Sequence, residues 1–175
     1  MEGTSVEFFI RSGYLVLKKC DFSIAGESPS NRKAVVAGYF NPFTNAHLSL
    51  IKNTSELFGE VIVLVVLGNE SGINSAQEIS KSIANILKRN NLTNCTVDIS
   101  SVPVAEYCKD AGISYLVRDV KNNFDFNYEN ELRQINSIIN QNLKTIFIPV
   151  EDDLVSSKTI QAIQKMGLSI DAFIP

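Results

Sequence analysis

From Lys33 onward, hydrophobic residues fall into short runs that alternate with longer stretches of helical periodicity. The run Val61–Leu67 is apolar at every position, which is typical of a central parallel strand covered on both faces. The pattern predicts strands at Ala34–Gly38, Glu60–Leu67, Thr96–Val102, Ser114–Val117 and Thr145–Pro149. It predicts helices at Ala46–Phe58, Ala76–Lys88, Val104–Ala111, Asn127–Gln141 and Lys158–Met166.

The alternation of strands and helices predicts an α/β domain over residues 33–175, with a doubly wound, five-stranded parallel sheet. Within residues 1–32, the short strands Glu7–Ile10 and Tyr14–Lys19 are expected to pair as an N-terminal β-hairpin, followed by a turn-rich linker. Apolar residues of the fourth helix recur at helical spacing and predict one buried stripe, which consists of Tyr128, Leu132, Ile135, Ile138 and Ile139.

Composition and charge exclude several classes of protein. The 175 residues are 45% apolar and 20% charged, as in a globular domain. A net charge of −3 gives no basis for general nucleic-acid or membrane-surface binding, while a small anion can still bind at a local site. Neither a signal peptide nor a transmembrane segment is expected. Cys20, Cys95 and Cys108 lack the spacing of a zinc site or disulfide framework, so the sequence predicts a cytoplasmic protein.

The segment Gly38–His47 is the strongest candidate for a functional loop. It follows a predicted strand and ends where the next predicted helix begins. A helix N-terminus presents unpaired N–H groups and the positive end of the helix dipole, which favour phosphate binding. His47 is the only histidine in the chain, and its imidazole can donate to a phosphate oxygen. A lone histidine is more often a cap or a surface residue, but its place at the end of this loop favours function.

Two further polar clusters follow predicted strands. Arg118–Lys121 comes after the fourth strand, and Glu151–Lys158 comes after the fifth. Ligands of open parallel sheets bind beyond the carboxyl ends of the strands, where the strand order reverses. Because the first and fourth strands usually flank that point, we expect His47 and Arg118 to face one cleft.

Simpler interpretations of the polar residues stay open at this point. Ser156 and Ser157 could only cap the last helix, since serine is common at helix starts. Glu129 could only pair with Arg133, one helical turn further along.

Three blocks of the chain resemble a known pattern. They read GYFNPFTNAH at 38–47, VRDVKNNFDFNYE at 117–129 and LVSSK at 154–158. These blocks resemble G-[ST]-F-D-P-x-T-x-G-H, V-R-G-L-R-x-x-x-D-F-E-Y-E and F-[IV]-S-S-[ST] of the nucleotidyltransferase superfamily with a T/H-x-G-H loop, above all of phosphopantetheine adenylyltransferases. The resemblance spans residues 33–175 and implies the Rossmann-like nucleotidyltransferase fold.

The resemblance also implies a reaction and its partners. AMP would pass from ATP to 4′-phosphopantetheine, giving dephospho-coenzyme A and pyrophosphate in coenzyme A biosynthesis. Mg²⁺ would be the cofactor and would bridge phosphate oxygens of the substrate instead of sitting in an all-protein cage. Members of this family tend to form homo-oligomers. Nucleic acid and membrane are not expected partners.

Roles for individual residues follow from the matched positions. His47, Arg118 and Lys121 would be catalytic, with His47 donating to the phosphoryl group in the transition state. ATP would contact Tyr39, Phe40, Thr44, His47, Glu129, Ser156 and Ser157. The acceptor would contact Tyr39, Val104 and Arg118, with its phosphate on Arg118.

The chain also departs from the family pattern. Loop 68–74 contains an acid, Glu70, and no lysine, whereas the family has a lysine there that contacts the reacting phosphate. Asp119 replaces a glycine, and Lys121 replaces an arginine that offers a planar fork to phosphate. Two alternatives therefore stay open. One is an adenylyltransferase for another phosphorylated acceptor, such as nicotinamide mononucleotide, and the other is a nucleotide-binding module that has lost catalysis.

Overall fold

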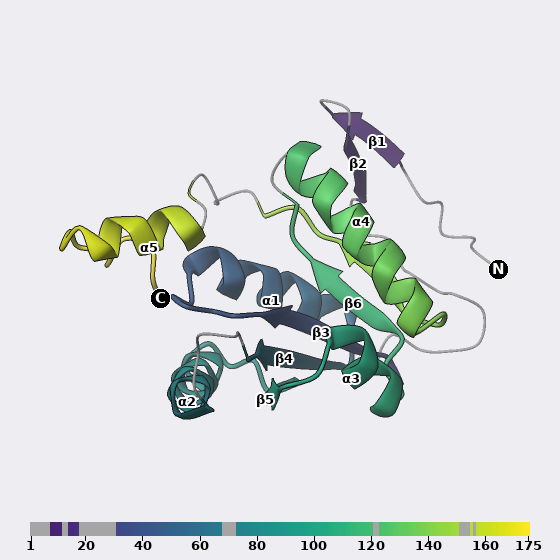
Figure 1. Cartoon of the computed structure of the whole chain (residues 1–175), viewed down its shortest axis with the longest axis horizontal. Coiled ribbons are helices and arrows are strands. Elements are labelled where there is room, and N and C mark those ends of the chain that lie inside the picture. Colours follow the sequence, from purple (N-terminus) through teal and green to yellow (C-terminus); the bar gives the residue numbers. More distant parts are fainter. Residues whose placement is uncertain are drawn as a thin grey trace.

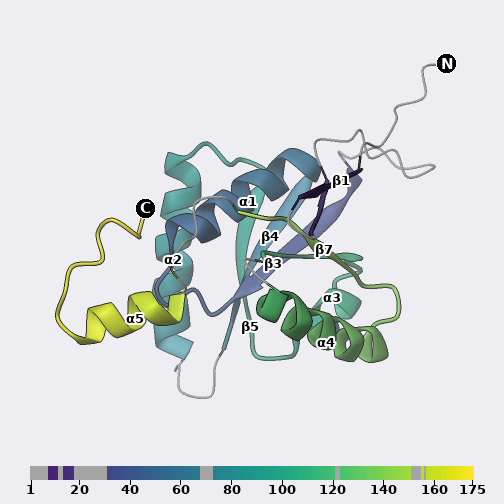
Figure 2. The same ribbon diagram turned by 90° about the horizontal axis from the view of Figure 1, so that it is seen from above.

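A five-stranded sheet organises the protein, which we describe from a computed structural model over residues 8–11, 14–17, 31–67, 73–120, 123–150, 155 and 157–175. Its strands are β3 (Lys33–Gly38), β4 (Glu60–Val66), β5 (Cys95–Ser100), β6 (Tyr115–Arg118) and β7 (Lys144–Phe147). Their order across the sheet is β5-β4-β3-β6-β7, and each neighbouring pair is parallel. Figure 1 labels β3 to β6, and Figure 2 labels β7. The predicted five-stranded parallel sheet is therefore confirmed.

Helices cover both faces of this sheet. They are α1 (Asn45–Leu57), α2 (Ile73–Arg89), α3 (Val104–Asp110), α4 (Asn123–Ile139) and α5 (Ser157–Lys165). Figure 2 shows α1 and α2 on one side of the strands and α3 and α4 on the other, as a doubly wound fold requires. None of the helices in the described ranges is both long and apolar enough to span a membrane.

The central strand β3 explains why both faces are covered. Val36 packs into the apolar cluster that also holds Leu48 and Ile51 of α1. Its neighbour Val35 points the other way, into the cluster with Cys108 of α3. Since successive side chains of a strand point to opposite faces, a strand that is apolar at every position needs a layer of helices on each side.

Four of the five apolar residues of the α4 stripe are exposed and Leu132 is partly buried, so the prediction that the stripe is buried was wrong. The side chains of Tyr128, Ile135 and Ile138 are 61%, 54% and 80% exposed. Glu129 is instead buried on this helix, with 8% exposure, because its carboxylate meets Arg118 of β6. The helix thus turns an acidic residue toward the sheet, and its apolar stripe faces away.

Near the start of the chain, β1 (Phe8–Arg11) and β2 (Tyr14–Leu17) pair antiparallel as a separate two-stranded sheet. The register places Phe8 opposite Leu17. The linker expected between this pair and the main domain lies almost entirely outside the described residues, so the division of the chain after residue 32 stays a prediction.

Candidate active site

The strand order reverses between β3 and β6, and these two strands end at the same edge of the sheet. Their register pairs Val36 with Val117. The next residue is Ala37 in β3 and Arg118 in β6. Nη1 of Arg118 donates to the carbonyl oxygen of Ala37 at 2.7 Å. This bond joins the strand that leads into the Gly38–His47 loop to the second predicted block of site residues.

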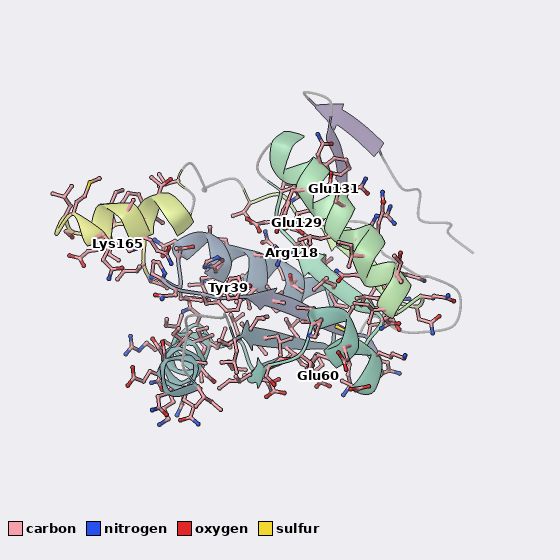
Figure 3. The ribbon with its side chains drawn as sticks, viewed as in Figure 1. Tyr39, Glu60, Arg118, Glu129, Glu131 and Lys165 are labelled. Atoms are coloured by element: carbon pink, nitrogen blue, oxygen red, sulfur yellow. The ribbon has the colours of Figure 1, made fainter. Side chains whose placement is uncertain are left out.

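The guanidinium of Arg118 also forms a bidentate ion pair with Glu129 (Figure 3). Nε donates to Oε2 at 2.9 Å, and Nη2 donates to Oε1 at 2.5 Å. Burial disfavours the charge on Arg118, but the hydrogen bonds and negative charge of Glu129, with Asp119 nearby, outweigh it, and the pKa of Arg118 is raised. Arg118 is therefore a fixed cation at this edge.

The Arg118–Glu129 pair changes the interpretation of both residues. Glu129 does not pair with Arg133, whose Nε donates to Asn130 at 3.0 Å instead. The bonds to Glu129 and Ala37 use three of the five N–H donors of a guanidinium, and leave one donor on each of Nη1 and Nη2 outside these bonds. Two adjacent terminal nitrogens suit the oxygens of a phosphate.

The Gly38–His47 loop is built around the ring of Phe40. Phe40 has a positive φ of 49° and is only 4% exposed. Its ring lies against Gly38, where an added Cβ would come within 3.1 Å of the ring edge. The ring also contacts Phe43 and His47, with centroids 5.7 and 5.1 Å away. Phe40 is thus the core of the loop, whereas Tyr39 is 62% exposed beside it.

Thr44 caps helix α1 and holds the ring of His47. The backbone N–H of Thr44 donates to Nδ1 of His47 at 3.0 Å. The Thr44 hydroxyl lies 3.1 Å from the same Nδ1 and accepts the backbone N–H of His47 at 3.4 Å. The pair forms a reciprocal cap, in which a histidine takes the place that Glu or Gln usually fills. His47 therefore has a fixed orientation at the start of the helix.

The C-terminal segment also contacts this loop, a feature that the sequence did not suggest. The backbone N–H of Asn45 donates to the carbonyl oxygen of Phe173 at 2.9 Å, and its side-chain amide donates to Ala172 at 3.2 Å. From α5, Gln161 donates to the carbonyl oxygen of Asn41. One amide of the helix start, expected to be open to phosphate, is thus bonded to the chain itself.

The remaining predicted site residues lie in different places. Val104 is the first residue of α3 and packs partly buried against the cluster with Cys108. Ser157 begins α5. Lys121 and Ser156, like the loop with Glu70, lie outside the described residues.

Burial disfavours the thiolate form of both cysteines in the described ranges. Cys95 and Cys108 are thiols, and burial raises the pKa of each to about 11, so neither forms a thiolate near neutral pH.

Comparisons with known proteins show the family of this chain. A model of the Cytidylyltransferase-like family matches residues 35–163. The chain belongs to this family. The predicted resemblance to nucleotidyltransferases is confirmed, and with it the class of enzyme, an adenylyltransferase-like nucleotidyltransferase.

Two relatives carry the name phosphopantetheine adenylyltransferase. The protein of Cytophaga hutchinsonii is 32% identical over 145 residues, which cover 81% of this chain and 95% of the relative. That of Clostridium tetani is 28% identical over 145 residues, covering 81% of this chain and 89% of its own. The crystal structure of "a Putative Nicotinate-nucleotide Adenylyltransferase from Vibrio parahaemolyticus" matches with a TM-score of 0.57 at 15% identity, over 82% of this chain and 92% of that chain. This last similarity supports the fold alone.

Proposed function

We propose that this enzyme transfers AMP from ATP to 4′-phosphopantetheine, giving dephospho-coenzyme A and pyrophosphate in a cytoplasmic step of coenzyme A biosynthesis. The names of the relatives with 28–32% identity support this acceptor. The observation that carries the proposal is the 2.7 Å hydrogen bond from Arg118 to Ala37, because it ties the acceptor-side arginine to the strand of the Gly38–His47 loop.

In the proposed reaction, a phosphate oxygen of the acceptor attacks the α-phosphorus of ATP. The bond from that phosphorus to the oxygen bridging to the β-phosphorus breaks, and pyrophosphate leaves with the bond electrons. Such a transfer needs positioning and charge stabilisation more than covalent help from the protein. Arg118 binds the acceptor phosphate with the donors that Glu129 and Ala37 leave, and His47 donates to the phosphoryl group as negative charge builds on it.

Other residues complete the proposed site. The backbone of Tyr39 and Phe40 lines the ATP side, where Thr44 holds the loop, and the backbone of Val104 faces the acceptor. Glu129 acts through Arg118, since both of its carboxylate oxygens are bonded to the guanidinium. We retain three further sequence-based assignments as proposals, namely Lys121 as a catalytic cation and Ser156 and Ser157 as ATP contacts.

Mg²⁺ would enter with the triphosphate and would neutralise part of its negative charge. In the described ranges, His, Cys, Asp and Glu side chains form no group of three or more that could hold a metal ion. The buried carboxylate of Glu129 is already engaged by Arg118. We therefore assign none of the described residues as a ligand of the ion.

The experiment that tests the function is a pyrophosphate-release assay with ATP, Mg²⁺ and a panel of phosphorylated acceptors. Release that depends on 4′-phosphopantetheine is the expected result. Pyrophosphate release only with nicotinamide mononucleotide would show that this compound, and not 4′-phosphopantetheine, is the acceptor. Nucleotide binding without release on any acceptor would identify a binding module and end the catalytic proposal.

We also propose that the protein is a homo-oligomer that associates through the exposed stripe of α4. Tyr128, Ile135 and Ile138 are each more than half exposed on one helix. Large contiguous apolar patches are uncommon on monomers and usually mark an interface. A second copy is the occupant that the family resemblance favours, and the molecular mass in solution tests it.

A further inference from the structure

The hydrogen bond between Thr44 and His47 restricts where the imidazole can carry its proton. The backbone N–H of Thr44 lies 3.0 Å from Nδ1 of His47 and points toward it. A backbone N–H can only donate, so the nitrogen that it meets must accept and cannot carry a proton of its own. In a neutral imidazole the single proton then belongs to Nε2.

The Thr44 side chain is compatible with the same tautomer. Its hydroxyl oxygen accepts the backbone N–H of His47 at 3.4 Å and lies 3.1 Å from Nδ1. A hydroxyl has one proton to give, and in this position it can share the lone pair of Nδ1 with the backbone N–H. The backbone N–H of Thr44 therefore favours an unprotonated Nδ1, the hydroxyl can accommodate it, and the residue itself is only 4% exposed.

The rings of two phenylalanines pack against the imidazole and fix its plane. Phe40 meets it edge-on, with centroids 5.1 Å apart and planes at 90°, and Phe43 lies 5.7 Å away. Both phenylalanines are buried. A 180° flip would keep the imidazole in nearly the same plane between these rings, but it would put a carbon in place of Nδ1 and break the bond from the Thr44 N–H.

We propose that Thr44 is a positioning residue that fixes His47 as the neutral tautomer with its proton on Nε2. The inference rests on the proposed function, in which His47 donates to the transferred phosphoryl group. The donor is then Nε2–H of an uncharged ring, and Nε2 has no lone pair to act as a general base. A second proton would have to go to Nδ1, where it would oppose the N–H of Thr44. The ring thus gives the transition state a directed hydrogen bond, and the positive charge of the site comes from Arg118.

Nitrogen NMR of the whole protein tests this assignment without any turnover. Because the chain contains a single histidine, its imidazole nitrogens give one unambiguous pair of signals. We expect an unprotonated Nδ1, a protonated Nε2 and a scalar coupling across the hydrogen bond between the Thr44 amide nitrogen and Nδ1. A protonated Nδ1 would overturn the proposal. An unprotonated Nδ1 without coupling to Thr44 would also overturn it, since Thr44 would not be the residue that sets the tautomer.

A pair of substitutions tests the consequence for catalysis. The side-chain amide of Gln can place N–H near the position of Nε2, whereas that of Asn reaches only the position of Nδ1. We expect His47→Gln to keep turnover within about tenfold of wild type and His47→Asn to lose on the order of 10²-fold. Equal losses in both variants would contradict a neutral donor at Nε2. The conservative variant Thr44→Ser keeps both the hydroxyl and the N–H, and should preserve the coupling between the amide of residue 44 and Nδ1.

The two experiments separate the inference from the function on which it rests. If wild type shows no turnover with any acceptor while Nδ1 is unprotonated and coupled to Thr44, the proposed reaction fails and the tautomer assignment stands. If turnover is normal and Nδ1 is protonated, the tautomer assignment fails and the reaction stands.

Discussion

Both carboxylate oxygens of Glu129 accept hydrogen bonds from the guanidinium of Arg118, at 2.9 and 2.5 Å. The pair connects helix α4 to strand β6 at the edge where the candidate active site lies. The side chain of Glu129 is 10% exposed and that of Arg118 is 28% exposed. Removing one member of a largely buried pair leaves the other charge without compensation, so each residue depends on the other.

Glu129→Gln tests the positioning of Arg118. The substitution keeps the shape of the side chain and removes its charge, so we expect the free energy of unfolding to fall by about 1–3 kcal/mol. Because Arg118 would lose its bidentate partner, KM for the acceptor should rise more than KM for ATP. Denaturant unfolding and steady-state kinetics measure the two effects. Glu131→Gln, at an exposed position of the same helix, is the matched control, and an equal change in both variants would contradict the assignment.

The contact between the C-terminal segment and the loop predicts an effect of a short truncation. Deleting residues 172–175 removes the carbonyl groups that accept from Asn45. The amide of Asn45 then loses its protein partner at the start of α1, and we expect about 1–2 kcal/mol less stability and slower turnover. Deleting Pro175 alone keeps both carbonyl groups and serves as the control. Unchanged turnover in the longer deletion would show that the tail does not position the loop.

The buried thiols predict a loss of stability at alkaline pH. Burial raises the pKa of Cys108 and of Cys95 from 9.0 to about 11. The folded state therefore holds neutral thiols, whereas the unfolded chain ionises them above about pH 9. The free energy of unfolding should fall as the pH rises from about 9 to about 11, and these groups should contribute no slope below that window.

Urea unfolding at a series of pH values measures this slope. The double variant Cys95→Ala, Cys108→Ala should show a shallower fall than wild type, whatever its stability at pH 7. Burial and a hydrogen bond to Asp98 also raise the pKa of Tyr107, so some slope should remain in the variant. An identical dependence of the free energy of unfolding on pH in both proteins would contradict the assignment of this slope to the two thiols.

The exposed stripe of α4 predicts that self-association depends on Ile138. This side chain is 80% exposed, so replacing it with Lys should cost the monomer little. We expect wild type to have the mass of an oligomer by light scattering and Ile138→Lys to have a lower mass. Lys165→Glu, on helix α5, is a control for a change of surface charge. A wild-type protein that is monomeric at all concentrations would refute the proposal.

Much of the fold could be predicted because its signals are local. The run Val61–Leu67 has no alternation, and β4 is indeed flanked by β3 and β5. The face of α4 could not be predicted in this way. Periodic apolar residues show that a helix has an apolar side, but not that the sheet covers it. The pairing of Glu129 with Arg118, between a helix and a strand, decided the orientation.

For the candidate site too, local sequence patterns predicted some features, whereas contacts between distant residues could not be predicted. The Gly38–His47 loop was predicted from its place between a strand and a helix, and the structure has that loop at the expected edge. The roles of its residues stay predictions. The tail contacts could not be foreseen, because Ala172 lies 127 residues from Asn45 and no local pattern marks such a pair. Likewise, the bonding of Thr44 to His47 depends on the ring orientation that Phe40 and Phe43 impose.

Phosphorus NMR of a mixture of ATP, 4′-phosphopantetheine and Mg²⁺ follows both sides of the central reaction in one sample. With wild-type enzyme, we expect pyrophosphate and a new P–O–P diester to appear at equal rates. With His47→Ala, both rates should fall by on the order of 10²–10³-fold while ATP affinity changes little, since the contact strengthens in the transition state. Pyrophosphate without the diester, no product at all, or equal rates in the two proteins would contradict adenylyl transfer at this edge of the sheet.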